Sequence, residues 1–348
     1  MKSFSKKLLE WYNPASRNLP WKQTNDAYKI WLSEIILQQT RVEQGTPYYL
    51  AFVKKYPTVK KLAAAPLDDV LKLWEGLGYY SRARNLHIAA QQVMEEHNGK
   101  FPETHAEILQ LKGIGNYTAA AIASFAYNLP HAVLDGNVFR VLSRVFGIET
   151  PIDSTEGKKQ FEQLAQQLLD KKNPSTYNQA IMDFGALVCK PQNPLCEQCP
   201  FSSECKALET DSIGSLPVKA KKLIKSERHF HYFVLHDGQH IFIRQRSAKD
   251  IWKGLFEFPM EEADSQWSIT NSQILKKFNR HLSSENHGLS YRQTLSHQYI
   301  NGHFHEIKLE RLPTHDKSYL RISKNTILNY AFPKIIRSYL EDRLNFLS

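Results

Sequence analysis

Residues 111–120, LKGIGNYTAA, place Gly113 and Gly115 directly before a stretch that favours a helix. Glycine tolerates positive φ, and the first turn of a helix exposes unpaired N–H groups at its positive dipole end. The stretch therefore predicts a tight turn and a helix N-terminus, which is either an anion site or an ordinary corner between two helices. Tyr117 follows in the first turn of that helix. A tyrosine hydroxyl at this position would support different chemistry from a lysine amine, so the identity of this residue bears on the function.

The size and charge of the chain narrow its class. Its 348 residues exceed one usual domain, so at least two domains are expected. With 42% hydrophobic and 23% charged residues, the composition is that of a folded globular protein. No apolar run approaches the ~18 residues that span a bilayer, and the N-terminus lacks a secretory signal pattern, so we expect a cytoplasmic protein without membrane association. The net charge of +10 favours a polyanionic partner.

All four cysteines lie in one short stretch, CKPQNPLCEQCPFSSEC, as Cys189, Cys196, Cys199 and Cys205. Because an intracellular compartment keeps thiols reduced, this spacing favours a metal centre over disulfide bonds. Zinc and a [4Fe–4S] cluster both take four cysteines, and the spacing alone leaves both open.

A basic run, SLPVKAKKLIKSER over residues 215–228, carries Glu227 as its single acid and is typical of a solvated linker at a domain boundary. Beyond it, residues 231–246, HYFVLHDGQHIFIRQR, alternate apolar and polar residues around Asp237 and Gly238. This pattern predicts a β-hairpin and the start of a β-rich domain.

Two carboxylates have surroundings that suit acid–base chemistry. Glu34 lies in a helical pattern whose neighbouring turns are mostly apolar, and burial there would raise its pKa as a general acid requires. Alternatively, Glu34, Gln38 and Arg41 form a solvated helix face. Asp135 precedes a helix as an N-cap, and the capping hydrogen bonds are expected to lower its pKa and keep it ionised. One protonated and one ionised carboxyl is the pairing that cleaves glycosidic bonds.

Five stretches together resemble the endonuclease III superfamily of DNA glycosylases and, within it, the adenine DNA glycosylase (MutY) family. They cover residues 19–49, 76–86, 111–127, 134–148 and 189–205, the last directly after YNQAIMDFGALVC.

The resemblance implies a multidomain architecture of α and α+β parts. An all-α helix-hairpin-helix glycosylase region with an iron–sulfur loop is expected over residues 1–210, followed by a basic linker over 211–227. A Nudix-like α+β domain is expected over 228–348. The resemblance also implies a [4Fe–4S] cluster on the four cysteines and a DNA phosphate bound at Gly113 and Gly115.

Catalytic roles follow from the same resemblance. Glu34 matches the residue that protonates the departing adenine, Asp135 the residue that stabilises the sugar cation or adds to it, and Asn137 a residue that helps position the nucleophile. Tyr117 stands where lyase members carry a lysine that forms a Schiff base. Because a phenol forms no imine, the resemblance implies a monofunctional glycosylase with Tyr117 lining its pocket.

Contacts to DNA are implied as well, because a base inside a duplex must be flipped out before it can react. By resemblance, Gln39 and Tyr79 fill the gap left by the flipped base. Gln179 lines the pocket where many relatives have glutamate. By resemblance, a C-terminal loop formed by Leu295, Ser296 and His297 contacts the 8-oxoguanine opposite the adenine. Leu295 stands where the family has phenylalanine.

The expected function is hydrolytic removal of adenine mispaired with 8-oxoguanine or guanine in double-stranded DNA, during base excision repair. We expect a monomer that works beside other repair or replication proteins. One alternative is an endonuclease III-like lyase acting on damaged pyrimidines, against which Tyr117 and the C-terminal extension argue. Another is a cluster protein that only binds DNA, against which Glu34 and Asp135 argue.

Two features of the C-terminal part are expected to carry no catalysis. Residues 247–262, SAKDIWKGLFEFPMEE, look like the start of a Nudix-type fold, but the glutamate-rich magnesium helix is absent, so a phosphohydrolase is not expected. His303 and His305 are spaced for one strand face, and we attribute them to the high histidine content of this part of the chain.

Overall fold

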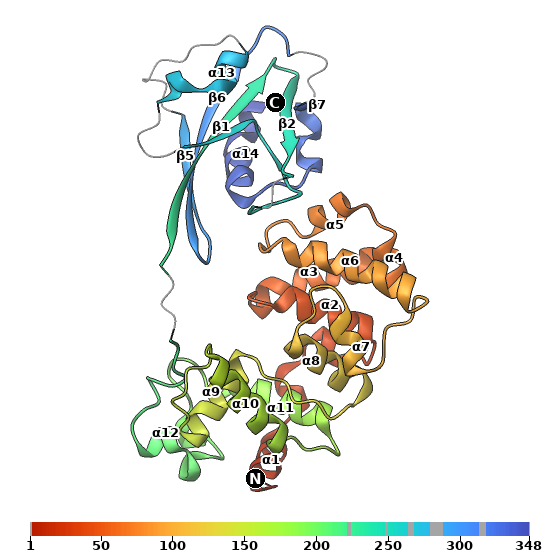
Figure 1. Ribbon diagram of the computed structural model, residues 1–348, viewed down its shortest axis with the longest axis vertical. Coiled ribbons are helices and arrows are strands. Elements are labelled where there is room, and N and C mark those ends of the chain that lie inside the picture. Colours follow the sequence, from red (N-terminus) through yellow and green to blue (C-terminus); the bar gives the residue numbers. More distant parts are fainter. Residues whose placement is uncertain are drawn as a thin grey trace. The chain divides into compact units, whose positions relative to one another are not determined.

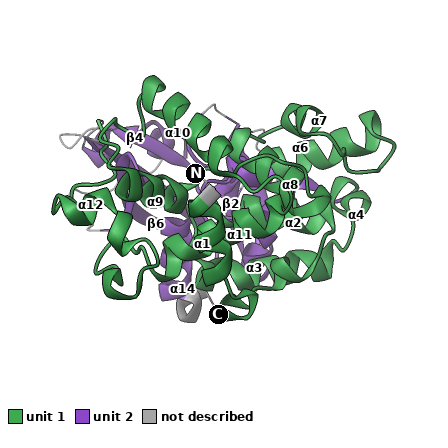
Figure 2. Cartoon of the chain, turned by 90° about the horizontal axis from the view of Figure 1, so that it is seen from below, with its two compact units in different colours: residues 1–64, 85–222 green, residues 65–84, 223–348 purple. Residues whose placement is uncertain are grey.

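The computed structural model describes residues 2–220, 224–247, 250–263, 268–278, 288–312 and 318–347. The chain forms two compact units (Figure 2). Unit 1 contains residues 1–64 and 85–222, and unit 2 contains residues 65–84 and 223–348.

Unit 1 is built of helices (Figure 1). In chain order they are α1 (Lys2–Trp11), η1 (Pro14–Arg17), η2 (Pro20–Gln23), α2 (Ala27–Leu37), α3 (Val42–Lys55), α4 (Val59–Ala63), most of α6 (Ser81–Glu96), α7 (His105–Gln110), α8 (Asn116–Tyr127), α9 (Gly136–Phe146), α10 (Thr155–Leu168), α11 (Pro174–Leu187), η3 (Cys196–Gln198), η4 (Ser202–Glu204) and α12 (Lys206–Glu209).

Local signals explain where these helices start and stop. Thr104 and Glu107 form a capping box that begins α7. The turn between α7 and α8 confirms the predicted helical hairpin: Gly113 has a φ of 79°, whereas Gly115 is the N-cap of α8 with a φ of −105°. A side chain at Gly113 would also collide with Asn85, so only this glycine is required by the turn.

One hydrophobic core of unit 1 brings the N-terminal helix α1 together with residues 120–201. α1 packs on α10 and α11, and α11 packs on both α8 and α9. Phe161, Phe184 and Phe201 are fully buried at this junction, so the cysteine loop is anchored to the same core as α9 and α11.

Unit 2 is a mixed sheet with helices. Its strands are β1 (Ser226–His236), β2 (His240–Gln245), β3 (Phe256–Glu257), β4 (Met260–Ala263), β5 (Leu289–Thr294), β6 (Gln298–Lys308) and β7 (Leu320–Ser323). Its helices are α5 (Leu67–Leu73), η5 (Ile269–Asn271), α13 (Gln273–Lys277), η6 (Lys324–Asn329) and α14 (Lys334–Leu347). The order is β3-β2-β1-β6-β5, with β4 beside β1 and β7 beside β2.

The pairing of β1 fixes the layout of this sheet. β1 runs parallel to β6 with His231 opposite His303, and antiparallel to β2 with His236 opposite Ile241. The β1–β2 hairpin turns at Asp237 and Gly238, which confirms the predicted turn. The expected class, a helical region followed by an α+β domain, is confirmed.

Residues 65–84 belong to unit 2, although they lie within the expected helical region of the sequence. Lys72 Nζ donates to the carbonyl of Tyr330 at 3.1 Å, and the amide of Phe332 donates to Glu75 Oε1 at 2.9 Å. None of the described helices combines the length and apolar character needed to cross a bilayer.

Candidate active site

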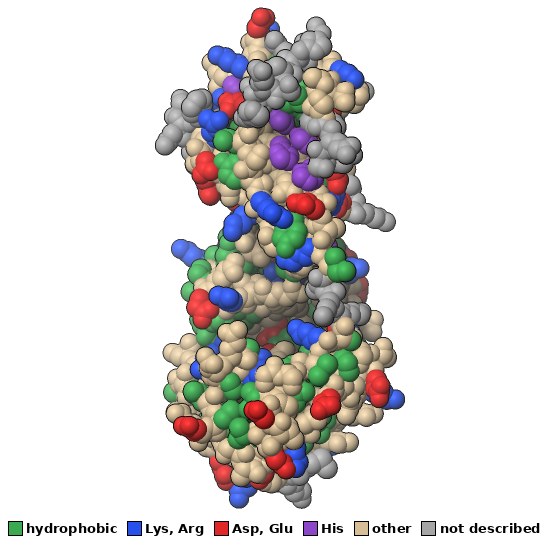
Figure 3. All heavy atoms as spheres, turned by 90° about the vertical axis from the view of Figure 1, so that its left-hand side faces the viewer, with side chains coloured by type: hydrophobic (Ala, Val, Ile, Leu, Met, Phe, Trp, Pro, Cys, Tyr) green, Lys and Arg blue, Asp and Glu red, His purple; other side chains and the backbone are tan. Residues whose placement is uncertain are grey.

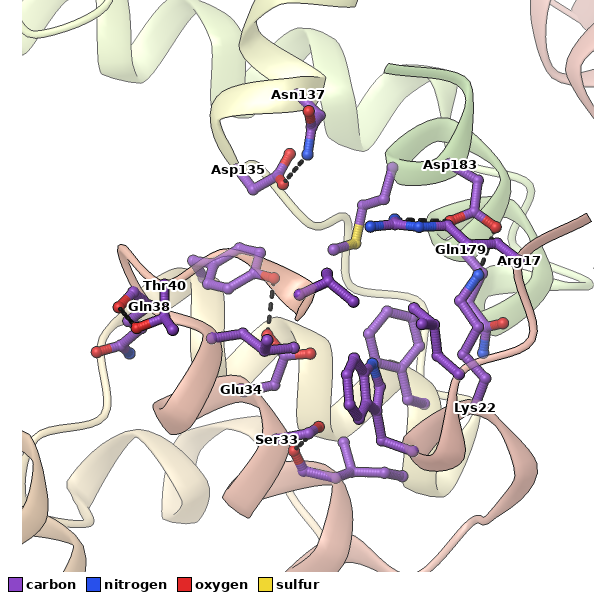
Figure 4. Close-up of a pocket in the computed structure, with 18 of the residues that line it drawn as sticks. Arg17, Lys22, Ser33, Glu34, Gln38, Thr40, Asp135, Asn137, Gln179 and Asp183 are labelled. Atoms are coloured by element: carbon purple, nitrogen blue, oxygen red, sulfur yellow. Dashed lines mark hydrogen bonds and ion pairs between the residues drawn. The ribbon is translucent and has the colours of Figure 1, made fainter. Parts of the chain in front are cut away.

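A pocket of about 340 Å³ in unit 1 gathers most of the expected catalytic residues (Figure 4). Its wall includes side chains from α2, α8, α9, α11 and the segment before α2. Glu34 and Asp135 lie on one side, and Gln179 lies across from them (Figure 4). Residues that are far apart in sequence therefore share one site.

Glu34 sits inside α2 with 7% of its surface exposed. Tyr117 Oη donates a hydrogen bond to Glu34 Oε2 at 2.7 Å. Burial raises the pKa of Glu34 to about 7, and the nearby charge of Asp135 adds to the rise, while the Tyr117 hydrogen bond opposes it. The solvated-face alternative therefore does not hold for Glu34, and its carboxyl can carry a proton near neutral pH.

Asp135 is the N-cap of α9, as expected. Its Oδ1 accepts from the amide of Val138 at 2.8 Å, and its Oδ2 accepts from Asn137 Nδ2 at 2.8 Å. The expected lowering of its pKa is wrong: burial raises the pKa of Asp135, and these hydrogen bonds and the charge of Arg140 only oppose that rise. Capping was visible in the sequence, whereas the depth of the site was not.

Tyr117 belongs to the first turn of α8 and points its hydroxyl at Glu34. Burial raises the pKa of Tyr117 well above its usual value, and the two nearby carboxyls add to the rise. Tyr117 is therefore a neutral phenol that can donate to Glu34.

The far wall of the pocket holds charged residues that sequence reasoning missed. Asp183 is 2% exposed; its Oδ1 accepts from Arg17 at 3.2 Å, and its Oδ2 accepts a hydrogen bond from Lys22. Gln179 and Asp183 are four residues apart on α11, which places both on one helix face. That spacing was the available signal, but nothing in it identified Arg17 or Lys22 as partners.

The two residues expected to fill the gap in DNA share an uncommon backbone conformation. Gln39 has a φ of 54° and Tyr79 a φ of 47°. Non-glycine residues in this region cost about 1–3 kcal/mol and are held there by their surroundings, often at functional sites. Gln39 is exposed at the pocket of unit 1, and Tyr79, in unit 2, is 42% exposed.

The expected 8-oxoguanine loop forms the turn between β5 and β6. Leu295 is half-buried, while Ser296 and His297 are exposed. Tyr79 Oη and Ser296 Oγ are hydrogen-bonded, and both residues line one pocket of unit 2. Unit 2 thus brings Tyr79 together with the loop.

The four cysteines line a second pocket in unit 1. Arg144 Nη1 lies 3.6 Å from Cys189 Sγ, and the carbonyl of Arg144 accepts from Cys205 Sγ at 3.4 Å. Burial raises the pKa of Cys199 to about 11, with a further rise from the other cysteines. Four half-buried thiols that line one pocket suit a group that binds thiolates. Among the described residues, no three metal-binding side chains are placed to hold a single ion.

Histidines of β1 and β6 form a cluster on one face of the sheet in unit 2 (Figure 3). His229 Nδ1 lies 3.3 Å from His303 Nε2, and His231 Nδ1 lies 3.2 Å from His305 Nε2. His303 and His305 are therefore halves of two hydrogen-bonded pairs, an arrangement that their sequence spacing did not reveal.

Comparisons with known proteins agree with this architecture. Residues 32–171 match the HhH-GPD superfamily of base excision DNA repair proteins, and residues 231–342 match the NUDIX domain. Among solved structures, a thermostable thymine-DNA glycosylase aligns with a TM-score of 0.56 and 31% identity, over 60% of this chain and 96% of that one. A trapped endonuclease III–DNA covalent intermediate has the same fold, with a TM-score of 0.53 and 22% identity over 60% of this chain and 94% of that one. Fold and site define a DNA glycosylase of base excision repair.

Relatives in sequence narrow the class further. The adenine DNA glycosylase of Buchnera aphidicola subsp. Baizongia pistaciae is 38% identical over 297 residues, which are 83% of each chain. The human adenine DNA glycosylase is 47% identical over 215 residues, 59% of this chain and 39% of that protein. The chain belongs to the adenine DNA glycosylase family, which confirms the resemblance seen in its motifs.

Proposed function

We propose that this DNA glycosylase hydrolyses the bond between adenine and deoxyribose where adenine is mispaired with 8-oxoguanine or guanine in double-stranded DNA. The observation that carries the proposal is the pairing of Glu34 with Asp135 in one buried pocket. The names of the relatives supply adenine as the base.

In the proposed reaction, Glu34 enters protonated and gives its proton to a nitrogen of the departing adenine. Asp135, held by Val138 and Asn137, acts as the anion that stabilises the positive sugar or adds to its anomeric carbon. The bond between the anomeric carbon and the base breaks and adenine leaves. Water then bonds to the anomeric carbon, displacing Asp135 if that carboxylate has added, and the proton that water loses restores the protonated form of Glu34. Asp135 accepts more hydrogen bonds than Glu34 does, which supports giving it the anionic role.

The proposed enzyme is monofunctional. Tyr117 offers a phenol where a Schiff base would require an amine. Lys22 does line the pocket, but its ammonium group is bound by Asp183 on the wall across from Glu34 (Figure 4).

DNA contacts are assigned to the remaining predicted residues. A phosphate would bind the N-terminus of α8 after Gly113 and Gly115, and Gln39 and Tyr79 would occupy the space of the flipped nucleotide. Unit 2 would recognise 8-oxoguanine through the loop of Leu295, Ser296 and His297. This role is supported by the position of the loop, which lines the same pocket as Tyr79.

The cysteine pocket would hold a [4Fe–4S] cluster through Cys189, Cys196, Cys199 and Cys205. Such a group would bind the four thiolates and connect the cysteine loop to α11 and to α9, the helix that Asp135 caps. Purified protein should contain about four irons per chain and absorb near ~410 nm. Stoichiometric zinc instead of iron would overturn this assignment.

The function is tested by single-turnover cleavage of duplexes that contain adenine opposite 8-oxoguanine or guanine, with and without alkali. Strand breaks that need alkali, and that disappear with Glu34→Gln, are the expected result. Breaks without alkali would indicate a lyase, and no breaks in any treatment would contradict the proposed substrate.

A further inference from the structure

Gln179 lines the pocket, and its side-chain amide is hydrogen-bonded to Tyr12, a residue that does not line it. Tyr12 follows α1, and its Oη donates to Gln179 Oε1 at 3.2 Å. Burial raises the pKa of Tyr12 to about 12, with a further rise from Asp183, so the phenol stays neutral and keeps its proton to donate. Because the carbonyl end of the Gln179 amide is engaged, its NH₂ end is the one left for a ligand.

The hydrogen-bonding capacity of Gln179 supports this orientation. None of the hydrogen bonds between side chains of the described residues uses Nε2 of Gln179, although the side chain lines the pocket. An amide nitrogen at that place presents two donors and no acceptor.

The same wall has little acceptor capacity left. Asp183 is its buried carboxylate, and both of its oxygens already accept from Arg17 and Lys22. Arg17 and Lys22 carry donors only, and both line the pocket with Gln179. The wall across from Glu34 therefore offers N–H donors to a bound base.

We propose that Tyr12 is a positioning residue that sets base specificity, by holding Gln179 so that its NH₂ group faces the base. The inference rests on the proposed function and deepens it. Adenine has acceptor nitrogens at N1, N3 and N7 and a single donor, the exocyclic amine. A donor wall recognises the ring nitrogens, so the exocyclic amine contributes little to recognition by this enzyme.

The test compares adenine with unsubstituted purine, which keeps the ring nitrogens and lacks the amine. Single-turnover rates are measured for each base opposite 8-oxoguanine, and the purine-to-adenine rate ratio is compared between wild type and variants. The different intrinsic labilities of the two bases cancel in this comparison.

Two variants change the wall in a defined way. Gln179→Glu replaces the donor end by an acceptor for the adenine amine, so the purine-to-adenine ratio should fall by roughly tenfold. Tyr12→Phe frees the amide to turn, so the ratio should fall by roughly threefold. Tyr127→Phe removes a hydroxyl that bonds the carbonyl of Phe101, outside the pocket, and should leave the ratio unchanged.

Each outcome decides a different point. An unchanged ratio in Gln179→Glu would overturn the donor wall, whether or not Tyr12→Phe folds. A ratio that falls in Gln179→Glu but not in folded Tyr12→Phe would overturn the role of Tyr12. Wild-type protein that cleaves neither base would overturn the proposed function itself, which separates that failure from the first two.

Discussion

Tyr117 and Glu34 lie 83 positions apart in sequence, yet the phenol donates a 2.7 Å hydrogen bond to the buried carboxyl. This bond lowers the pKa of Glu34 while burial raises it to about 7. The residue that replaces a lyase lysine therefore adjusts the proposed general acid.

Removal of that bond should shift the pH dependence of cleavage. In Tyr117→Phe the pKa of Glu34 rises further, so the loss of activity at alkaline pH should move up by about half to one pH unit. The sign follows because Glu34 acts protonated and is inactivated as pH rises through its pKa. Single-turnover rates from pH 5 to 9 measure the shift, and Tyr127→Phe, from the same helix, is the control. An alkaline limb that stays in place would show that the bond does not control Glu34.

Asparagine at position 135 separates capping from catalysis. Asn caps helices about as well as Asp, so Asp135→Asn should keep the unfolding free energy within about 1 kcal/mol. It lacks the negative charge, and cleavage should fall by roughly 10³-fold or more. Asp26→Asn is the matched control, because Asp26 caps α2 through the amides of Tyr28 and Lys29. Equal activity losses in the two variants would argue against a special role for Asp135.

The left-handed conformation of Gln39 predicts a conflict between stability and function. Gln39→Gly relieves an unfavourable φ, which offsets the entropic cost of glycine, so the unfolding free energy should stay within about 1 kcal/mol. Gln44→Gly, in the first turn of α3, replaces a helix-favouring residue that has no such φ to relieve and should lose up to about 1 kcal/mol. Only Gln39→Gly should slow cleavage and weaken binding to mispaired DNA. Urea unfolding and single-turnover assays measure both effects, and unimpaired cleavage by Gln39→Gly would remove Gln39 from the DNA contacts.

The histidine cluster predicts acid sensitivity of unit 2. Burial lowers the pKa of His231 to about 3 and that of His305 to about 4, and neighbouring histidines add to both shifts. Because the unfolded chain takes up these protons near pH 6.5, the stability they contribute is complete above that pH and is lost as pH falls toward 4. Thermal unfolding between pH 7 and 4 should show this loss, and His231→Gln should reduce it.

The control for this prediction is His97→Gln, a substitution directly after α6 in unit 1 that leaves the cluster intact. It should unfold with the pH dependence of the wild type. An equal reduction in both variants would mean that the cluster is not the source of the acid sensitivity.

Features set by neighbouring residues were predictable. The helical hairpin at Gly113, the N-cap at Asp135, the hairpin at Asp237 and the spacing of the cysteines all depend on backbone preferences within a few positions. The motif order also identified the family, and with it the class of fold.

Long-range electrostatics were not predictable from the motifs. The pKa of Asp135 moves opposite to expectation because the folded protein removes its carboxyl from water, and burial is a property of the whole pocket. Asp183 meets Lys22 across 161 positions of sequence, and His231 meets His305 across 74. Because the partners are so far apart in the chain, neither pair produces a short sequence pattern that could have predicted it.

By itself, therefore, the sequence determined the turns, caps and residue types that chemistry requires, because these follow from local backbone geometry and side-chain identity. Tertiary structure alone decided how deeply Glu34 and Asp135 are buried, which end of the Gln179 amide bonds to Tyr12 and which unit residues 65–84 join. Packing brings distant segments together and excludes water, and those two effects set the pKa values and hydrogen-bond directions on which the proposed reaction depends.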